Sequence, residues 1–264
     1  MPGNDKSFDN LVQIMRALRA PGGCNWDRAQ TSHSLLPYMI EETYEVIEAA
    51  ESNNLLKLKE ELGDVLLHIL FQAEIAEEKG AFNIFDVVSI ITQKMIERHP
   101  HVFGDRKDLT PEEVRENWEA VKLSKRQKEN RQETILSGVP KTMPALLKAY
   151  RVQEKAAQFG FDWENTEEIF DKIDEELQEF KSALKENNVP AIREELGDLL
   201  FSLVNFARHL HTEPESCLNG TIKKFTERFD KMEKALQADG LTLKQATLEQ
   251  MENHWQQVKK SDPR

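Results

Sequence analysis

The sequence predicts an all-α fold made of two copies of one helical-bundle domain. Leu, Ile and Val recur at helical spacing between charged residues, a pattern typical of amphipathic helices. Only 11 Gly and 10 Pro occur among the 264 residues, and most of them fall between the periodic segments. Short blocks also occur twice, in the same order along the chain, which indicates a tandem duplication.

The repeated blocks are rich in carboxylates. Glu41-Glu42-x-x-Glu45 returns as Glu175-Glu176-x-x-Glu179, and the block Glu60 to Asp64 returns as Glu194 to Asp198. Two basic and aromatic blocks follow: Lys94-x-x-x-Arg98 pairs with Lys224-x-x-x-Arg228, and the Trp118 to Lys122 block pairs with Trp255 to Lys259.

The domain organisation follows from these blocks. We expect an N-terminal copy over 1–128, a polar linker with Gly138 and Pro140 over 129–142, and a C-terminal copy over 143–264. One continuous helical domain is the alternative. The expected helices cover about 7–19, 35–51, 55–79, 84–98, 111–128, 143–158, 166–187, 190–211, 214–238 and 244–260.

Composition excludes several function classes. A net charge of −12 repels a phosphate backbone, so we expect no nucleic-acid polymer as partner. No apolar run is long enough for a membrane span, and the N-terminus does not resemble a signal peptide. Cys24 and Cys217 are far apart and form no metal-spaced pair, which fits a reduced, cytoplasmic compartment.

The carboxylates stand where a helix should be buried. Past Leu196 the second repeated helix is apolar almost all round, yet Asp198 lies one turn after Glu195. The same holds for Glu61 and Asp64, while Glu42 and Glu45 flank a stripe with Val46 and Ala49. Buried carboxylates raise one another's pKa or need a cation, and ligands that are all oxygen favour Mg²⁺, with Mn²⁺ as a substitute.

Simpler interpretations remain at this point. An i,i+3 pair of Glu is usually a solvated helix face, and the cation could be structural. A di-iron centre needs two Glu-x-x-His pairs, which the chain lacks. We therefore interpret His68, one turn after Asp64, as a histidine of the core or its rim; Ser202 stands at its place in the second copy.

Basic and aromatic residues share helical faces near the end of each copy. Lys224 and Arg228 are either helical partners of Glu or a clamp on phosphate oxygens. Trp255 and Lys259 also share a face, and the indole either stacks on a base or anchors helix packing.

Together these residues resemble the two-domain bacterial form of the MazG family of nucleoside triphosphate pyrophosphohydrolases. The signature is Glu-Glu-x-x-Glu followed by Glu-x-x-Asp, and the segments around Trp26, His99-Pro100-His101 and Gly160 to Trp163 add to the resemblance. It implies Mg²⁺-dependent cleavage of a ribo- or deoxynucleoside triphosphate to the monophosphate and diphosphate by a homodimer.

The resemblance also implies that the C-terminal copy carries the activity. Glu176, Glu179, Glu195 and Asp198 would hold Mg²⁺, and Lys172, Lys224, Arg228, Trp255 and Lys259 would meet the nucleotide. Glu42, Glu45, Glu61 and Asp64 are the matching metal candidates of the first copy. Tyr38 replaces Lys172 there, so we expect that copy to lack a phosphate-facing cation and to serve in regulation or dimerisation.

The expected reaction is metal-assisted hydrolysis. A metal-activated water would attack the α-phosphorus, with Glu175 taking the proton beside the ligand Glu176. The rival hypothesis is a non-catalytic helical scaffold that binds nucleotide or metal for regulation. We expect a homodimer because one copy alone is thin for burying Asp198.

Overall fold

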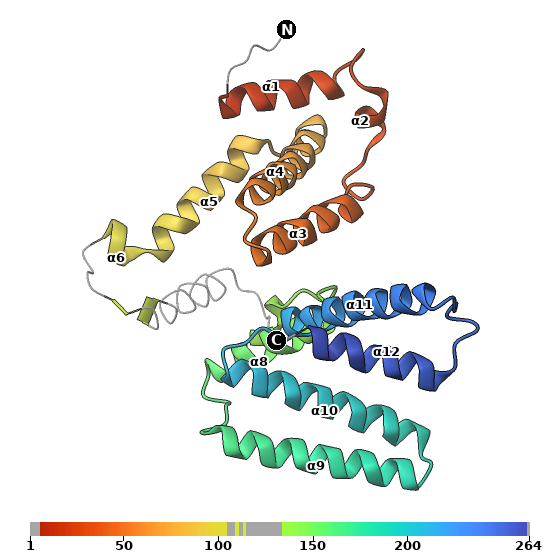
Figure 1. The fold of residues 1–264 in the computed structure, drawn as a ribbon. Coiled ribbons are helices and arrows are strands. Elements are labelled where there is room, and N and C mark those ends of the chain that lie inside the picture. The colour runs from red at the N-terminus through yellow and green to blue at the C-terminus, as the bar shows by residue number, and fades with distance from the viewer. Residues whose placement is uncertain (1–5, 105–108, 111–112, 115–133, 263–264) are drawn as a thin grey trace. The chain divides into compact units, whose positions relative to one another are not determined.

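The computed structural model describes residues 6–104, 109–110, 113–114 and 134–262. The chain divides into two compact units, Met1–Lys125 and Arg126–Arg264, and each is described by itself (Figure 1). The described residues form helices and turns, and none of them lies in a strand, which confirms the all-α class.

Unit one is built around a hairpin of two helices, α3 and α4 (Figure 1). The N-terminal helix α1 packs on α4 and on the short α2, and α5 follows α4 along the chain. The helices of this unit are α1 (Phe8–Arg19), α2 (Asn25–Ala29), α3 (Leu36–Glu51), α4 (Leu55–Glu78), α5 (Ile84–Arg98) and α6 (Pro100–Phe103).

The core of unit one lies where α1 meets the second half of α4. Val12 and Met15 of α1 pack with Leu70 and Phe71 of α4, and each is at most 3% exposed. Arg16 on the same helix makes hydrogen bonds of 2.7 and 2.8 Å to the carboxylate of Glu77. This packing leaves the first half of α4, which carries Glu61 and Asp64, to face α3.

Unit two repeats the hairpin as α9 and α10 (Figure 1). The preceding helix α8 packs on α10 and on α11, and α12 packs on α11 alone among the described helices. The elements are the 3₁₀ turn η1 (Ile135–Gly138), α8 (Ala145–Ala157), α9 (Thr166–Lys185), α10 (Val189–His209), α11 (Pro214–Ala238) and α12 (Leu248–Ser261).

Both hairpins use the same two-asparagine turn. Asn53 and Asn187 end the first helix of each hairpin with φ of 54° and 55°, a left-handed conformation that Asn tolerates better than most residues. The following Asn54 and Asn188 each cap the second helix through a side-chain oxygen. Matching turns set matching helix registers, so equivalent carboxylates meet across both hairpins.

The expected helices agree with the structure to within a few residues where both can be compared. The last helix begins at Leu248 rather than near 244 because Thr247 and Gln250 form a capping box. The sequence prediction omits α2 and α6, which are too short to carry a hydrophobic period. Most of the expected helix 111–128 lies outside the described residues.

The described part of the expected linker, residues 134–142, is exposed apart from the buried Val139. Within it Ile135–Gly138 forms η1, which packs on α8.

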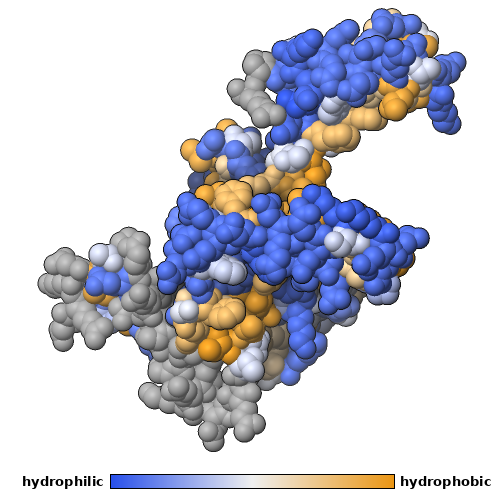
Figure 2. Space-filling model, turned by 90° about the horizontal axis from the view of Figure 1, so that it is seen from below, coloured by the Kyte–Doolittle hydropathy of each residue, from blue (hydrophilic) through white to orange (hydrophobic). Residues whose placement is uncertain are grey.

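The helices expected to be buried on all sides are only partly covered within one chain. Leu196, Leu200 and Leu203 of α10 are 44–46% exposed, and Leu62 of α4 is 52% exposed. Figure 2 shows apolar side chains, in orange, open to solvent on the face of the molecule that it draws. The reason is the small number of neighbours: α10 contacts only α8, α9 and α11 among the described helices.

Leu236→Ala is expected to lower the free energy of unfolding by roughly 2–5 kcal/mol, because Leu236 is fully buried between α11 and α12. Urea denaturation followed by circular dichroism measures the change. Leu248→Ala is the matched control, since Leu248 is 82% exposed at the start of α12. Equal losses for the two variants would contradict the assignment of this core.

Candidate functional site: a carboxylate cluster in each unit

The cluster of unit two lies between α9 and α10. Glu176 and Glu179 come from α9 and Glu195 from α10, and each offers a carboxylate oxygen within 4.8 Å of the others. Glu176 is buried at 5% exposure, Glu195 is partly buried and Glu179 is exposed. The hairpin register therefore brings together three of the four carboxylates that the sequence predicts as metal ligands.

The fourth predicted ligand, Asp198, lies one turn further along α10. It is exposed within the chain, where α10 contacts only α8, α9 and α11 among the described helices, as expected if one copy alone is too thin to bury it. Its charge still acts on the cluster, since Asp198 is among the carboxylates that raise the pKa of Glu195. It also lines the cavity described below.

The electrostatics of this cluster favour a bound cation. Burial raises the pKa of Glu195, and repulsion from Glu179, Glu176 and Asp198 raises it further. The cluster offers only oxygen donors, and they lie within 4.8 Å of one another. Hard divalent cations such as Mg²⁺ prefer ligand sets of this kind. The residues present therefore fit a divalent metal.

Lys172 partly neutralises the cluster from one side. Its Nζ lies 2.8 Å from Glu176 and 3.0 Å from Glu175, on the preceding turn of α9. The hydrogen bonds to Glu176 and then Glu175 raise the pKa of Lys172, so the ammonium stays charged. Glu175 itself points to Lys172, is exposed, and is not part of the three-carboxylate cluster.

A cavity of about 610 Å³ adjoins the cluster. Lys172, Glu176 and Asp198 line it together with Ser202, and its other walls come from η1, α8, α10 and the segment before α9. Aromatic side chains contribute much of that wall: Phe161, Trp163 and Phe201. The site thus combines charged groups and an apolar, aromatic recess in one place.

Two features of this cavity lie beyond the residues singled out from the sequence. Gln153 of α8 is 7% exposed and donates a hydrogen bond of 2.8 Å to the Phe201 carbonyl. Asp162 pairs with Arg208 and His209 of α10; burial acts to raise its pKa, but the hydrogen bonds from Arg208 and His209 lower it overall. Gln153 lies within an amphipathic helix and Asp162 in the segment before α9, and neither position carries a sequence signal of such contacts.

The other predicted nucleotide-binding residues lie away from the cluster within the chain. Lys224 is exposed on α11, and Lys259 is exposed on α12. Arg228 is buried, with its Nε 3.3 Å from Asp262. The ring of Trp255 packs 5.2 Å from that of Phe225, as a packing anchor does. Neither α11 nor α12 packs on α9 among the described elements.

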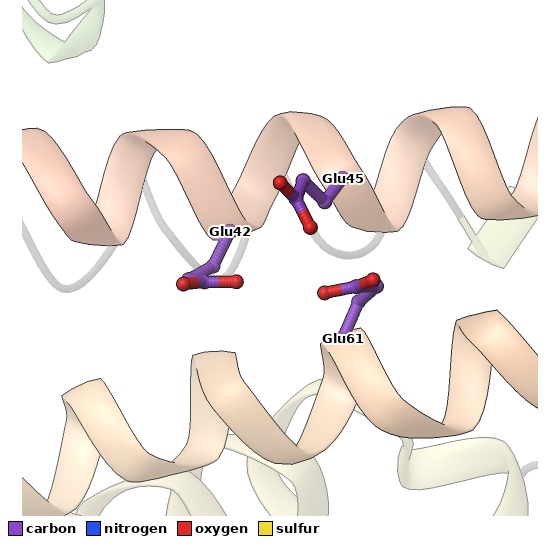
Figure 3. Close-up of side chains that lie close together, drawn as sticks. All are labelled: Glu42, Glu45 and Glu61. Carbon is purple, nitrogen blue, oxygen red and sulfur yellow. The ribbon is translucent and has the colours of Figure 1, made fainter.

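Unit one holds the equivalent cluster between α3 and α4. Glu42 and Glu45 of α3 converge on Glu61 of α4, with ligand oxygens within 4.8 Å of one another (Figure 3). Burial raises the pKa of Glu42, as do Asp64 and Glu45. Burial also raises the pKa of Glu61, and Glu45 raises it further.

The surroundings of the two clusters differ at the position of Lys172. Tyr38 stands there in unit one, 44% exposed, with its ring edge-on to Trp26. The nearest lysine, Lys57, lies at the other end of the cluster, 3.4 Å from Glu48 and 3.9 Å from Glu61. The structure therefore supports the sequence-based distinction between the two copies at this position.

Across the described residues, no helix combines the length and the apolar character that a membrane span requires.

Comparison with known protein families finds the same domain in both copies. The family model described as the MazG nucleotide pyrophosphohydrolase domain matches residues 30–103 and 164–232, which hold the two clusters. A Thermotoga maritima protein named nucleoside triphosphate pyrophosphohydrolase/pyrophosphatase MazG is 46% identical over 255 residues, covering 97% of this chain and 96% of that protein.

An Escherichia coli K12 protein named nucleoside triphosphate pyrophosphohydrolase is 40% identical over 258 residues, covering 97% of this chain and 98% of the relative. These matches confirm the resemblance inferred from the carboxylate motifs. The chain belongs to the family of the MazG nucleotide pyrophosphohydrolase domain, and carries that domain's carboxylate cluster in each of its two units.

Proposed function

We propose that this chain is a Mg²⁺-dependent nucleoside triphosphate pyrophosphohydrolase whose active site is the cluster of unit two. The observation that carries the proposal is the convergence of Glu176, Glu179 and Glu195 beside a cavity that also holds Lys172. The names of two relatives, each similar along nearly the whole chain, support the same reaction.

The cluster would hold the metal through Glu176, Glu179 and Glu195, with Asp198 at its edge. Bound there, Mg²⁺ would supply Lewis-acid polarisation of phosphate oxygens and lower the pKa of a coordinated water. Mn²⁺, which accepts the same oxygen donors, is the expected substitute.

The side chains of unit two have separate tasks in this proposal. The Lys172 ammonium, fixed by Glu176, would offset negative charge on the phosphates. Water attacks the α-phosphorus, a new P–O bond forms, and the bond from the α-phosphorus to the bridging oxygen breaks. Diphosphate leaves, and Glu175 is our candidate for accepting the proton of the water.

The adjoining cavity is our candidate for the nucleoside. Its volume of about 610 Å³ lies within the range of roughly 300–1,000 Å³ that is usual for small-ligand sites. Trp163 and Phe161 offer aromatic faces on which a base can stack. Stacking tolerates every base, which fits an enzyme that accepts nucleotides with different bases.

A second copy of the chain would complete the site. Leu196, Leu200 and Leu203 form an exposed apolar stripe on α10, and Leu218, Ile222 and Phe225 form another on α11. Burying both stripes in a homodimer removes apolar surface from water. Because α11 and α12 do not pack on α9 among the described elements, we propose that the exposed Lys224 and Lys259 serve the nucleotide of the partner. Arg228 and Trp255 instead keep their contacts with Asp262 and Phe225 within the chain.

Product analysis tests the reaction. The purified chain is incubated with a panel of nucleoside triphosphates, with Mg²⁺ or with EDTA, and the products are resolved by chromatography. We expect monophosphate and diphosphate, formed only with the metal. Nucleoside diphosphate plus phosphate, the products of cleavage at the γ-phosphorus, would contradict attack at the α-phosphorus. Binding without turnover would favour the regulatory scaffold.

Glu176→Gln is expected to lower kcat/KM about 100-fold or more, because it removes the charge of a buried metal ligand at nearly constant shape. Glu42→Gln makes the same change in unit one, where Tyr38 replaces Lys172, and we expect a much smaller loss. The same chromatographic assay compares the two. A larger loss of kcat/KM for Glu42→Gln would indicate that the active site lies in unit one.

Glu195→Gln separates repulsion from metal binding. The pKa of Glu195 is raised in the folded state. The metal-free protein therefore becomes more stable as the pH falls from neutral, through that raised pKa, toward the ordinary value of 4.5. In EDTA at neutral pH the uncharged variant should therefore melt at a higher temperature than wild type, and the difference should shrink on acidification. With Mg²⁺ the order should reverse, since the cation stabilises only the complete set.

Scanning fluorimetry in EDTA and in Mg²⁺ measures both melting temperatures. Glu249→Gln, an exposed change in the first turn of α12, controls for the loss of one negative charge. A lower melting temperature of Glu195→Gln in EDTA would show that the carboxylates do not repel one another as proposed.

Mixing two inactive variants tests the shared site. Glu176→Gln damages the cluster, and Lys224→Met removes a charge that we assign to the site of the partner. In a mixed dimer one site carries both changes and the other is intact, so re-equilibrated mixtures should recover about a quarter of the wild-type rate. Analytical ultracentrifugation checks that dimers form. A mixture as inactive as its components would place Lys224 in the same chain's site, and an active Lys224→Met homodimer would place it outside the site.

A further inference from the structure

Gln153 is a buried polar side chain in the wall of the unit-two cavity, and the proposed reaction gives it no task. It belongs to α8, is 7% exposed, and lines the cavity beside Val152 and Ala156 of the same helix. Its Oε1 is buried and has no hydrogen-bond partner among the described residues. A buried acceptor without a partner costs free energy and requires an explanation, such as a ligand that donates to it.

The contact of Gln153 with α10 fixes which end of its amide is free. Its Nε2 donates a hydrogen bond of 2.8 Å to the Phe201 carbonyl. A carbonyl oxygen can only accept, so the amide nitrogen has to face it and the amide oxygen is left over. Because this bond and the burial of the side chain hold the amide in place, Oε1 is a fixed acceptor in the cavity wall.

Gln153 meets α10 beyond the carboxylate cluster, on the part of the cavity that we assign to the nucleoside. The cavity follows α10 from Asp198 to Arg208, which are ten residues apart, about 15 Å along a helix. Phe201 lies nearly one turn past Asp198 in this direction. The aromatic segment 161–163 is held at the far end of the cavity, because Asp162 pairs with Arg208. Gln153 therefore lies between the phosphate end and the aromatic end.

Neighbouring acceptors in this part of the cavity already have donors. The Oδ1 of Asn205 accepts hydrogen bonds of 3.1 and 2.8 Å from Nε and Nη2 of Arg208. The carboxylate of Asp162 accepts from Arg208 and from His209. The Oε1 of Gln153 differs from them, since no described residue donates to it. A polar group of this kind in an apolar, aromatic recess is typical of the few contacts that orient a ligand.

We propose that Gln153 determines which bases the site accepts, by taking a hydrogen bond from an N–H on the pairing edge of the base. Every standard base offers such a donor: adenine and cytosine through an exocyclic amino group, and guanine, uracil and thymine through a ring N–H. One fixed acceptor therefore admits all of them and rejects a base whose edge has no N–H, which stacking alone does not reject. This inference rests on the proposed function, because it concerns the same cavity.

Nucleotide analogues that lack the donor test the proposal. Purine riboside triphosphate is ATP without its amino group, and 2-pyrimidinone riboside triphosphate is CTP without its amino group. Both keep a ring that can stack, and neither has an N–H on its pairing edge. With Mg²⁺ and the wild-type chain we expect kcat/KM to be about 10-fold lower, or more, for each analogue than for its parent, because the buried acceptor is left unpaired.

Gln153→Met removes the acceptor at similar size. We expect kcat/KM for ATP to fall about 10-fold and kcat/KM for purine riboside triphosphate to change much less, so that the preference for ATP nearly vanishes. Loss of the bond to Phe201 alone would lower both values by the same factor, so the ratio separates base recognition from helix packing. Gln158→Met is the matched control, since Gln158 is an exposed glutamine at the C-terminal end of α8, and it should keep the wild-type ratio.

Calorimetry with AMP and purine riboside monophosphate provides a readout that does not depend on turnover. We expect the wild-type chain to bind AMP about 10-fold more tightly than the analogue, and Gln153→Met to bind both alike. Circular dichroism checks folding, and Gln153→Leu is a second variant if the methionine variant does not fold.

Two results would overturn the proposal: equal kcat/KM and equal binding of parent and analogue in the wild-type chain, or a preference for the parent that Gln153→Met retains. A chain that hydrolyses nucleoside triphosphates without this preference would refute the role of Gln153 alone. A chain that prefers AMP through Gln153 yet hydrolyses no nucleotide would refute only the proposed function.

Discussion

Mutual repulsion among carboxylates that two antiparallel helices hold together is the constraint on which both units depend. In each hairpin three carboxylates offer oxygens within 4.8 Å of one another, and one of the three is 5% exposed. Burial and neighbouring charges raise the pKa of Glu195, Glu42 and Glu61. The surrounding fold has to stabilise such a cluster, and protonation or a cation relieves its charge.

The hairpin turn and the cores provide that stabilisation. The paired asparagines, Asn53 with Asn54 and Asn187 with Asn188, set the register that aligns α3 with α4 and α9 with α10. In unit one the packing of α1 on the far half of α4 lies away from Glu61, so α1 supports α4 without entering the carboxylate cluster. The cluster therefore occupies the half of the hairpin that lies outside this core.

The duplication supplies two copies of one carboxylate hairpin, and single substitutions give the two clusters different surroundings. Lys172 brings a positive charge to Glu176 in unit two, and Tyr38 brings none to Glu42 in unit one. His68 of unit one is buried, and its Nδ1 has no hydrogen-bond partner among the described residues, whereas Ser202, at its place in unit two, lines the cavity. The apolar stripes on α10 and α11 add a further requirement, since burying them needs a surface that the described chain does not itself provide.

Helical class, duplication, the main helix boundaries and the carboxylate candidates are all determined by the sequence, because they depend on local periodicity, capping and repeated residues. The two-asparagine turns and the placement of Glu176, Glu179 and Glu195 on facing sides follow from the same local rules. Tertiary structure alone decided that Asp198 is exposed, that Arg228 pairs with Asp262, and that Trp255 packs on Phe225. It also decided that Gln153 lines the cavity and that the Nδ1 of His68 has no partner. Burial and pairing of this kind depend on which distant helix covers a side chain, and periodicity along one helix carries no information about that neighbour.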